Sequence, residues 1–346
     1  MASDEEKNNL FLYLELIYLN KTTTMKKIPL LEKKDFGMLV GDCFEFIIQN
    51  FLRYSKGFAV LVLPPLLVIA GLMIPVMNGM IGLLKTVSDT GRFDLSIFAS
   101  FSFEVMMLIV LFVLFMLLSV LQNTYSYQYM LLYEAKASPA EMTVQELWEG
   151  VKSNFSFMLK SFLWFLGIFI LFLFVSFGFI ICVSVATKMK GLAIILMLGW
   201  FFLYIYGALA VMFFFFVRLR ERTDPIAALR RCFSLIYGRW WRTFGCVFLL
   251  ALLIGVAQAI LLTPLQSMSG MGTYPYSRIN HFKAEFPPLF AYVYAVSVVV
   301  SIYLSGLTSF AICLNYYNLV SLTEPEPIVI AEPTPPSSET SDSEPV

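Results

Sequence analysis

Residues 161–217 form a run of 57 residues in which Lys188 and Lys190 are the only charged side chains. The short hinge 187–191 divides this run into two apolar blocks, and each block exceeds the ~20 residues with which an α-helix crosses a bilayer. Lipid offers no hydrogen-bond partners to the backbone, so uniformly apolar runs of this length are typical of helices. The run therefore predicts a membrane-spanning helical hairpin.

Composition and pattern extend this prediction to the whole chain. The sequence is 59% hydrophobic and 14% charged, whereas soluble domains are about 25% charged. Six runs contain no Asp, Glu, Lys, Arg or His, and none shows the alternation that is typical of barrel strands. They cover residues 58–77, 105–121, 162–186, 192–217, 244–265 and 289–314. We expect an all-α polytopic membrane protein with six transmembrane helices arranged as three hairpins.

The distribution of basic residues predicts the orientation of these helices. The segment before the first run and the connections after the second and fourth runs hold 18 of the 24 Lys and Arg residues. Seven of these are arginines between Arg218 and Arg242. Because retained cytoplasmic loops are enriched in Lys and Arg, both termini are expected in the cytoplasm and the protein in an inner (cytoplasmic) membrane as a multi-pass protein.

Three segments can be distinguished along the chain. Residues 1–34 form an N-terminal segment in which Met25 is an alternative start, and residues 35–320 form the six-helix membrane domain. Residues 321–346 form an acidic tail rich in Pro and Ser, with no Lys or Arg. Such a tail has too little apolar surface to fold, so it is predicted to be disordered on the cytoplasmic side.

A short amphipathic helix is expected on the cytoplasmic side before the first, third and fifth runs. Asp35 is a plausible N-cap of the first helix, Thr143 and Glu146 form a capping box for the second, and Asp224-Pro225 starts the third. The expected apolar faces contain Phe36, Val40, Cys43, Phe44, Ile47 and Phe51 in the first helix, Val144, Leu147, Trp148 and Val151 in the second, and Ile226, Leu229, Phe233 and Ile236 in the third. These helices are predicted either to lie in the lipid headgroup region or to pack on the protein.

Two stretches carry a resemblance to a known group of proteins. They are LVGDCFEFIIQNFLRYSKGFAVLVLPPLLV and, further on, ALRRCFSLIYGRWWRTFGCVFLLALLIG. Over residues 35–320 the chain resembles uncharacterised bacterial six-span membrane proteins similar to the membrane domain associated with glycerophosphodiester phosphodiesterases. The soluble barrel that would hold the phosphodiesterase chemistry is missing here, so the resemblance implies a membrane location and transfers no catalytic residue.

The arginine-rich segment supplies the first set of candidate binding residues. Basic and aromatic side chains at the edge of a membrane run can bind lipid phosphates, each basic residue contributing about 1 kcal/mol near an anionic leaflet. The candidates for lipid headgroups are Arg230, Arg231, Arg239, Arg242, Trp240 and Trp241. Tyrosines at the end of the second run, Tyr125, Tyr127, Tyr129 and Tyr133, are expected to join Tyr316 and Tyr317 in an interfacial aromatic belt.

The second set of candidates is expected to pack helices together. Small residues at every fourth position allow helices to approach closely, and serines add hydrogen bonds between them. The fifth run contains Ala251, Gly255 and Ala259, and the sixth contains Ser297, Ser301, Ser305 and Ser309. These two faces are expected to pack on each other or on a neighbouring molecule, and a polar pore lining is the alternative. Pro64, Pro65 and Pro75 predict a kink in the first run.

Reactive groups are scarce in this sequence. His281 is the only histidine, the five cysteines form no CxxC pair, and neither a P-loop nor a GxSxG motif occurs. No catalytic residue, metal site or cofactor is therefore predicted, and a net charge of zero argues against nucleic acid as a partner. We expect a non-enzymatic scaffold or accessory protein that engages lipids, including anionic ones, or an unidentified protein partner. The alternative is a transporter or flippase-like permease for a neutral or lipid substrate.

Overall fold

The computed structural model describes residues 27–90, 102–186, 190–268 and 289–324. The predictions for the alternative start at Met25, for His281 and for most of the acidic tail lie outside these residues. Every regular element in the described ranges is helical. In chain order these are α2 (Phe36–Leu61), α3 (Leu63–Thr90), α5 (Ser102–Ala135), η1 (Pro139–Glu141), α6 (Val144–Ala186), α7 (Lys190–Val211), α8 (Phe214–Glu221), α9 (Pro225–Ile236), α10 (Trp240–Met268) and α11 (Phe290–Thr323).

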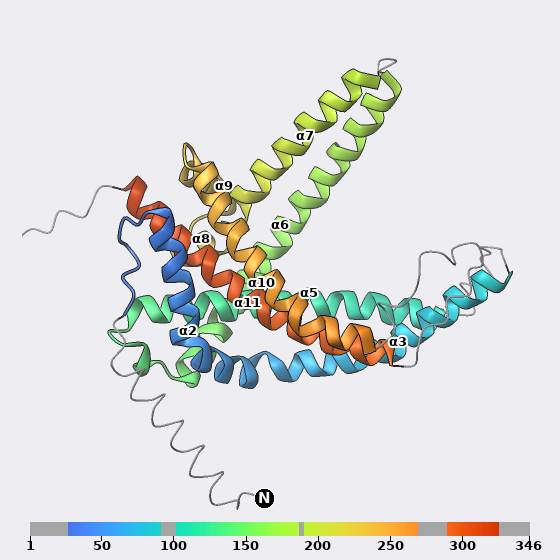
Figure 1. Ribbon diagram of the computed structural model, residues 1–346, viewed down its shortest axis with the longest axis horizontal. Helices are drawn as coiled ribbons and strands as arrows, with labels where there is room; N and C mark the ends of the chain where they lie inside the picture. Colours follow the sequence, from blue (N-terminus) through green and yellow to red (C-terminus); the bar gives the residue numbers. More distant parts are fainter. Residues whose placement is uncertain (1–26, 91–101, 187–189, 269–288, 325–346) are drawn as a thin grey trace, which may run out of the picture.

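Six helical segments are long and apolar enough to cross a membrane, and they lie in α3, α5, α6, α7 with α8, α10 and α11. This confirms the predicted all-α polytopic architecture, and the chain is a multi-pass integral membrane protein. The pairs α3–α5, α6–α7 and α10–α11 form the three expected hairpins (Figure 1). The central helix is α11, which contacts α2, α3, α5, α9 and α10.

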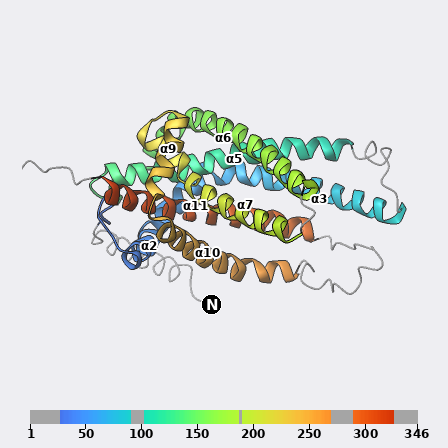
Figure 2. The same ribbon diagram turned by 90° about the horizontal axis from the view of Figure 1, so that it is seen from above.

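The α6–α7 hairpin diverges from the bundle of α3, α5, α10 and α11 (Figure 1), although both point toward the same end of the molecule when seen from above (Figure 2). Its side chains face outward almost everywhere. Among the described side chains of residues 162–208, only Val183 is buried. In a membrane protein such a surface is covered by lipid, so the hairpin is held to the bundle mainly at its base.

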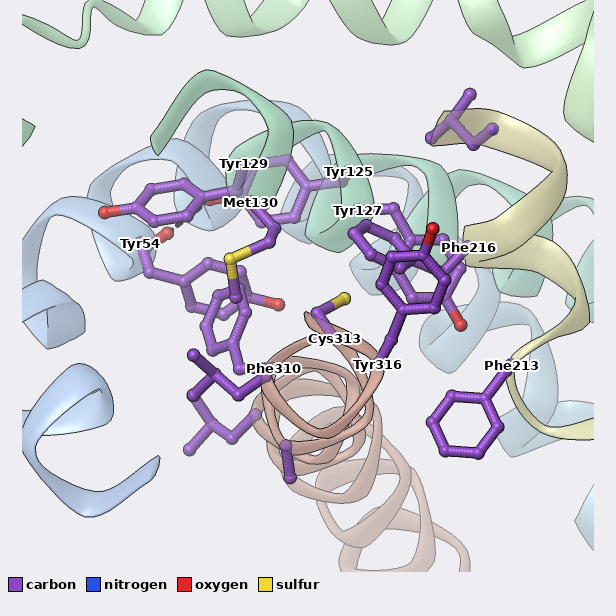
Figure 3. Packing of buried hydrophobic residues seen from close by; sticks show 14 of the residues in the cluster. Tyr54, Tyr125, Tyr127, Tyr129, Met130, Phe213, Phe216, Phe310, Cys313 and Tyr316 are labelled. Atoms are coloured by element: carbon purple, nitrogen blue, oxygen red, sulfur yellow. Dashed lines mark hydrogen bonds between the residues drawn. The ribbon is translucent and has the colours of Figure 1, made fainter. Parts of the chain in front are cut away.

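The best-packed part of the molecule lies at the opposite end, where α2, α8 and α9 meet the last turns of α5 and α11 (Figure 1). We call this the arginine-rich end, because residues 218–242 lie there. Aromatic side chains pack against α11 on two sides (Figure 3). The tyrosines predicted to form an interfacial belt belong to this core and are almost fully buried: Tyr125, Tyr127, Tyr129, Tyr133, Tyr316 and Tyr317. The prediction of a lipid-facing tyrosine belt was therefore wrong.

The first two surface segments differ in how they join their spans. Asp35 caps α2 by accepting a hydrogen bond from the amide of Met38 at 2.8 Å. The helix then breaks at Val62, and Pro64 and Pro65 occupy the first turn of α3, where a missing amide hydrogen costs little. Figure 1 shows α2 crossing the end of the bundle and α3 leading away along it. At Pro64 and Pro65 the expected kink of the first span is thus a break between two helices, whereas Pro75 lies within α3.

The second surface segment is continuous with its span. Thr143 and Glu146 form the predicted capping box, with reciprocal backbone to side-chain hydrogen bonds of 3.2 Å. From there α6 runs unbroken for 43 residues, which corresponds to about 65 Å at ~1.5 Å per residue. A bilayer core is only ~30 Å thick, so the first turns of α6 extend beyond it.

Candidate membrane-interface site

The third surface segment, α9, is a separate helix with defined ends. Asp224 takes the extended backbone conformation of an N-cap and Pro225 occupies the first turn, although the Asp224 side chain makes no capping hydrogen bond. The helix ends at Ile236, and Gly238 follows with φ of 72°. Only glycine adopts this conformation without strain. The turn at Gly238 allows α10 to start two residues later in a new direction.

The apolar surface of α9 divides into two faces. One face packs on the protein and consists of the buried side chains Ala228, Cys232, Leu235 and Ile236. On the other side Ile226 and Phe233 are exposed, and the following Tyr237 is 79% exposed. Phe233 touches only the edge of the core by stacking against Tyr206 of α7, with ring centroids 6.2 Å apart. The predicted apolar face is therefore split, and we call the exposed part, Ile226, Phe233 and Tyr237, the α9 strip.

Burial also determines the chemistry of the packed face. Burial, together with the nearby Glu221 carboxylate, raises the pKa of the Cys232 thiol to about 12. The thiolate is the nucleophilic form of cysteine. Cys232 is thus held as an unreactive thiol and serves as a small apolar side chain.

Two of the arginines predicted to reach lipid headgroups bind the protein instead. Arg231 pairs with Glu221 at 3.2 Å and with Glu324 at the end of α11. Arg239 donates a hydrogen bond of 2.9 Å to the carbonyl oxygen of Leu322. These contacts fasten the middle of α9 and the turn after it to the end of α11, so Arg231 and Arg239 are structural residues here.

Arg230 is the arginine that remains at the exposed surface of α9. It lies about 40° from Ile226 around the helix, since successive residues turn by ~100°. Within the described part of the chain it has no ion-pair partner. The exposed apolar strip and an unpaired cation therefore lie side by side on one helix.

The start of α10 completes this surface. Trp241 is 77% exposed, whereas Trp240 is half-buried and stacks on Phe244 with centroids 5.2 Å apart. Nε and Nη2 of Arg242 are buried and lack a hydrogen-bond partner among the described residues. Of the six predicted headgroup residues, only Arg230 and Trp241 are openly accessible.

Arg220, to which the sequence assigned only a topological role, takes part in a network at the arginine-rich end. Arg220 binds Glu134 of α5 through two hydrogen bonds of 2.7 and 3.2 Å. The hydroxyl of Tyr317 donates to the same carboxylate at 2.5 Å, and that of Tyr316 donates to Glu221 at 2.6 Å. Glu134 thus joins α5, α8 and α11. Alternating acidic and basic residues near the span ends were the only sequence signal for this network.

The first of the two predicted packing faces does not meet its partner. Ala251, Gly255 and Ala259 are exposed, and a Cβ added to Gly255 would have no other atom within 4 Å. The buried side chains of α10 are instead Thr243, Cys246, Leu250 and Leu262. The expected packing of the small residues on α11 was wrong, and their packing on a neighbouring molecule stays a prediction.

The serine face of α11 is only partly enclosed. Ser297 and Ser309 are buried, Ser301 is half-buried and Ser305 is exposed. Each hydroxyl donates to a carbonyl oxygen of its own helix. Ser301 also accepts a hydrogen bond of 2.7 Å from Gln258 of α10, which is a direct link between the two helices. A row of hydroxyls satisfied by their own backbone does not form a continuous polar path.

Among the residues with described coordinates, no group of three or more His, Cys, Asp or Glu side chains could hold a metal ion. Comparison with known proteins finds no matching family model, curated protein or solved structure. The interpretation of the site therefore depends on the geometry of this chain alone.

Proposed function

We propose that this protein is a non-enzymatic membrane scaffold or accessory subunit whose arginine-rich end lies at the cytoplasmic leaflet of an inner membrane. The α9 strip and Trp241 would lie at the headgroup level, with Arg230 binding anionic phosphate. The observation that carries this proposal is that α9 is anchored to the protein by one face while an apolar strip beside an unpaired arginine stays exposed.

The energetics of this arrangement favour lipid over water. An exposed Ile, Phe and Trp cost free energy in water, whereas at a membrane surface the apolar side chains reach the acyl boundary and the cation stays with the headgroups. The contacts of Arg231 and Arg239 with α11 hold α9 in place. The α9 strip is therefore already in place before a lipid headgroup binds to it.

The alternative of a lipid permease has less support in the described structure. Transported ions and protons normally need charged side chains at bilayer depth, and the apolar runs contain none. A lipid substrate would avoid that requirement, but the serine hydroxyls bond to their own helix and leave no polar route for a headgroup. The resemblance to the membrane domain associated with glycerophosphodiester phosphodiesterases stays a prediction.

Hydrogen exchange of residues 226–237 tests the proposal, measured on the full chain in nanodiscs of anionic or neutral phospholipid. The parent protein should be better protected in anionic lipid. Arg230→Gln should lose that difference, because it removes the cation of α9 that has no ion-pair partner among the described residues.

Arg231→Gln is the matched control on the same helix. Its ion pairs with Glu221 and Glu324 hold α9 to the protein, so its loss should lower protection equally in both lipids. If parent and Arg230→Gln are protected to the same degree in both lipids, α9 does not bind anionic headgroups and the proposed function loses its support.

A further inference from the structure

A groove of about 360 Å³ opens between α3, α5 and α6, on helices other than α9. Its volume lies within the range of small-molecule sites, which starts at about 300 Å³. Its lining consists of Pro65 and Ile69 from α3, Leu114, Leu117, Leu118 and Leu121 from α5, and Trp148, Val151, Lys152 and Phe155 from α6.

The geometry of α5 explains the shape of this groove. Leu114, Leu117, Leu118 and Leu121 have the i, i+3, i+4, i+7 spacing that places residues on one face of a helix. Because α5 packs against both α3 and α6, this leucine face forms the floor, and the two other helices form the walls. The floor belongs to the second apolar run, so the groove extends into the hydrocarbon region.

The α6 wall carries the two side chains that differ from this apolar lining. Trp148 is 45% exposed and Lys152, one turn further on, is also exposed. Both precede the apolar run of α6, Lys152 by 10 residues and Trp148 by 14, which is about 15 and 21 Å at ~1.5 Å per residue. Tryptophan and lysine are typical of the level at which lipid headgroups lie. The Lys152 ammonium has no ion-pair partner within the described ranges.

We propose that this groove binds one acyl chain of an anionic phospholipid, whose phosphate reaches Lys152. The leucine floor supplies an apolar channel that is open to the leaflet, and the single cation at its headgroup end supplies the charge complementarity. No residue of α9 takes part, so this site and the α9 surface can fail independently.

Lipid retention in native mass spectrometry tests the proposal on the full chain, equilibrated with phosphatidylglycerol or phosphatidylcholine. The parent protein should retain one phosphatidylglycerol in preference to phosphatidylcholine. Lys152→Gln should weaken phosphatidylglycerol binding about fivefold, because one basic residue near anionic lipid is worth roughly 1 kcal/mol. Lys160→Gln is the control, since Lys160 is exposed on the same helix and lies outside the groove.

A second pair of variants tests the groove itself. Leu117→Trp should fill the groove and reduce retention of both lipids, whereas Val113→Trp, exposed one turn earlier on α5 and outside the lining, should leave it unchanged. Melting temperatures identify a variant that fails to fold. If both Lys152→Gln and Leu117→Trp retain phosphatidylglycerol as the parent does, the groove is not a lipid site, whatever the result for Arg230.

Discussion

At the scale of single residues, Gly306 makes the closest packing of the central helix possible. Tyr54 of α2 points at this glycine, and its hydroxyl contacts Ser126 at 3.0 Å and accepts from Gln122 at 2.9 Å. A Cβ at position 306 would collide with Tyr54 and Gln122. This polar cluster therefore depends on the absence of a side chain on α11.

We expect Gly306→Ala to lower the melting temperature in detergent, because overpacking a filled site costs about 1–3 kcal/mol. Gly255→Ala is the matched control. Its new methyl group meets no other atom, and alanine is the better helix former by up to ~1 kcal/mol, so stability should stay equal or rise. Equal melting of the two variants would contradict the described packing of α11 on α2 and α5.

At the scale of elements, the surface helix α2 is fastened to α10 by a contact between cysteines. Cys43 and Cys246 are fully buried where α2 packs on α10, and their thiols interact with each other. Phe36 at the start of α2 also lies against α10, since a Cβ on Gly245 would lie 3.3 Å from its ring. Because about two hundred residues separate Cys43 from Cys246, the sequence did not predict that they are neighbours.

We predict that a small apolar oxidant such as iodine joins Cys43 to Cys246, each thiol giving up one proton and one electron to the oxidant. Peptide mapping should find this crosslink between α2 and α10. Cys43→Ser should abolish the product. Recovery of Cys43 and Cys246 as free thiols after full oxidation of an accessible engineered cysteine would place α2 away from α10.

At the scale of the whole molecule, the segments expected on the cytoplasmic side gather at one end of the bundle. The surface helices α2 and α9, the helix α8 and the last turns of α5 and α11 meet there, and α3 and α10 end at the other side (Figure 1). Three hairpins require this arrangement, because each hairpin returns the chain to the side from which it started.

Reporter fusions test this orientation along the chain. Fusions after Asn123, Arg222 and Val346 should report the cytoplasm, and fusions near Asp89, Lys188 and Gly272 should report the outside. The physical reason is that the basic side, with 18 of 24 Lys and Arg residues, is retained. A fusion at Val346 that reports the outside would contradict six spans with both termini in the cytoplasm.

The sequence by itself determined the six spans, because the length of an apolar run suffices to cross a bilayer and its backbone must then be helical. It also located the caps at Asp35 and Thr143, since capping depends on residues only three positions apart. Such signals are local, and no distant part of the chain can change them.

Only the tertiary structure decided which way the side chains of these helices face. Lipid and protein core are both apolar, so hydrophobicity does not distinguish Tyr125, which is buried, from Trp241, which is exposed. Likewise, Arg231 differs from Arg230 only because Glu221 and Glu324 lie within reach of it. Nothing in the sequence distinguishes Gly255 from Gly306, but of these two glycines only Gly306 has side chains of neighbouring helices close to it. In a membrane protein, the choice between lipid and protein contact is made by the partner helix.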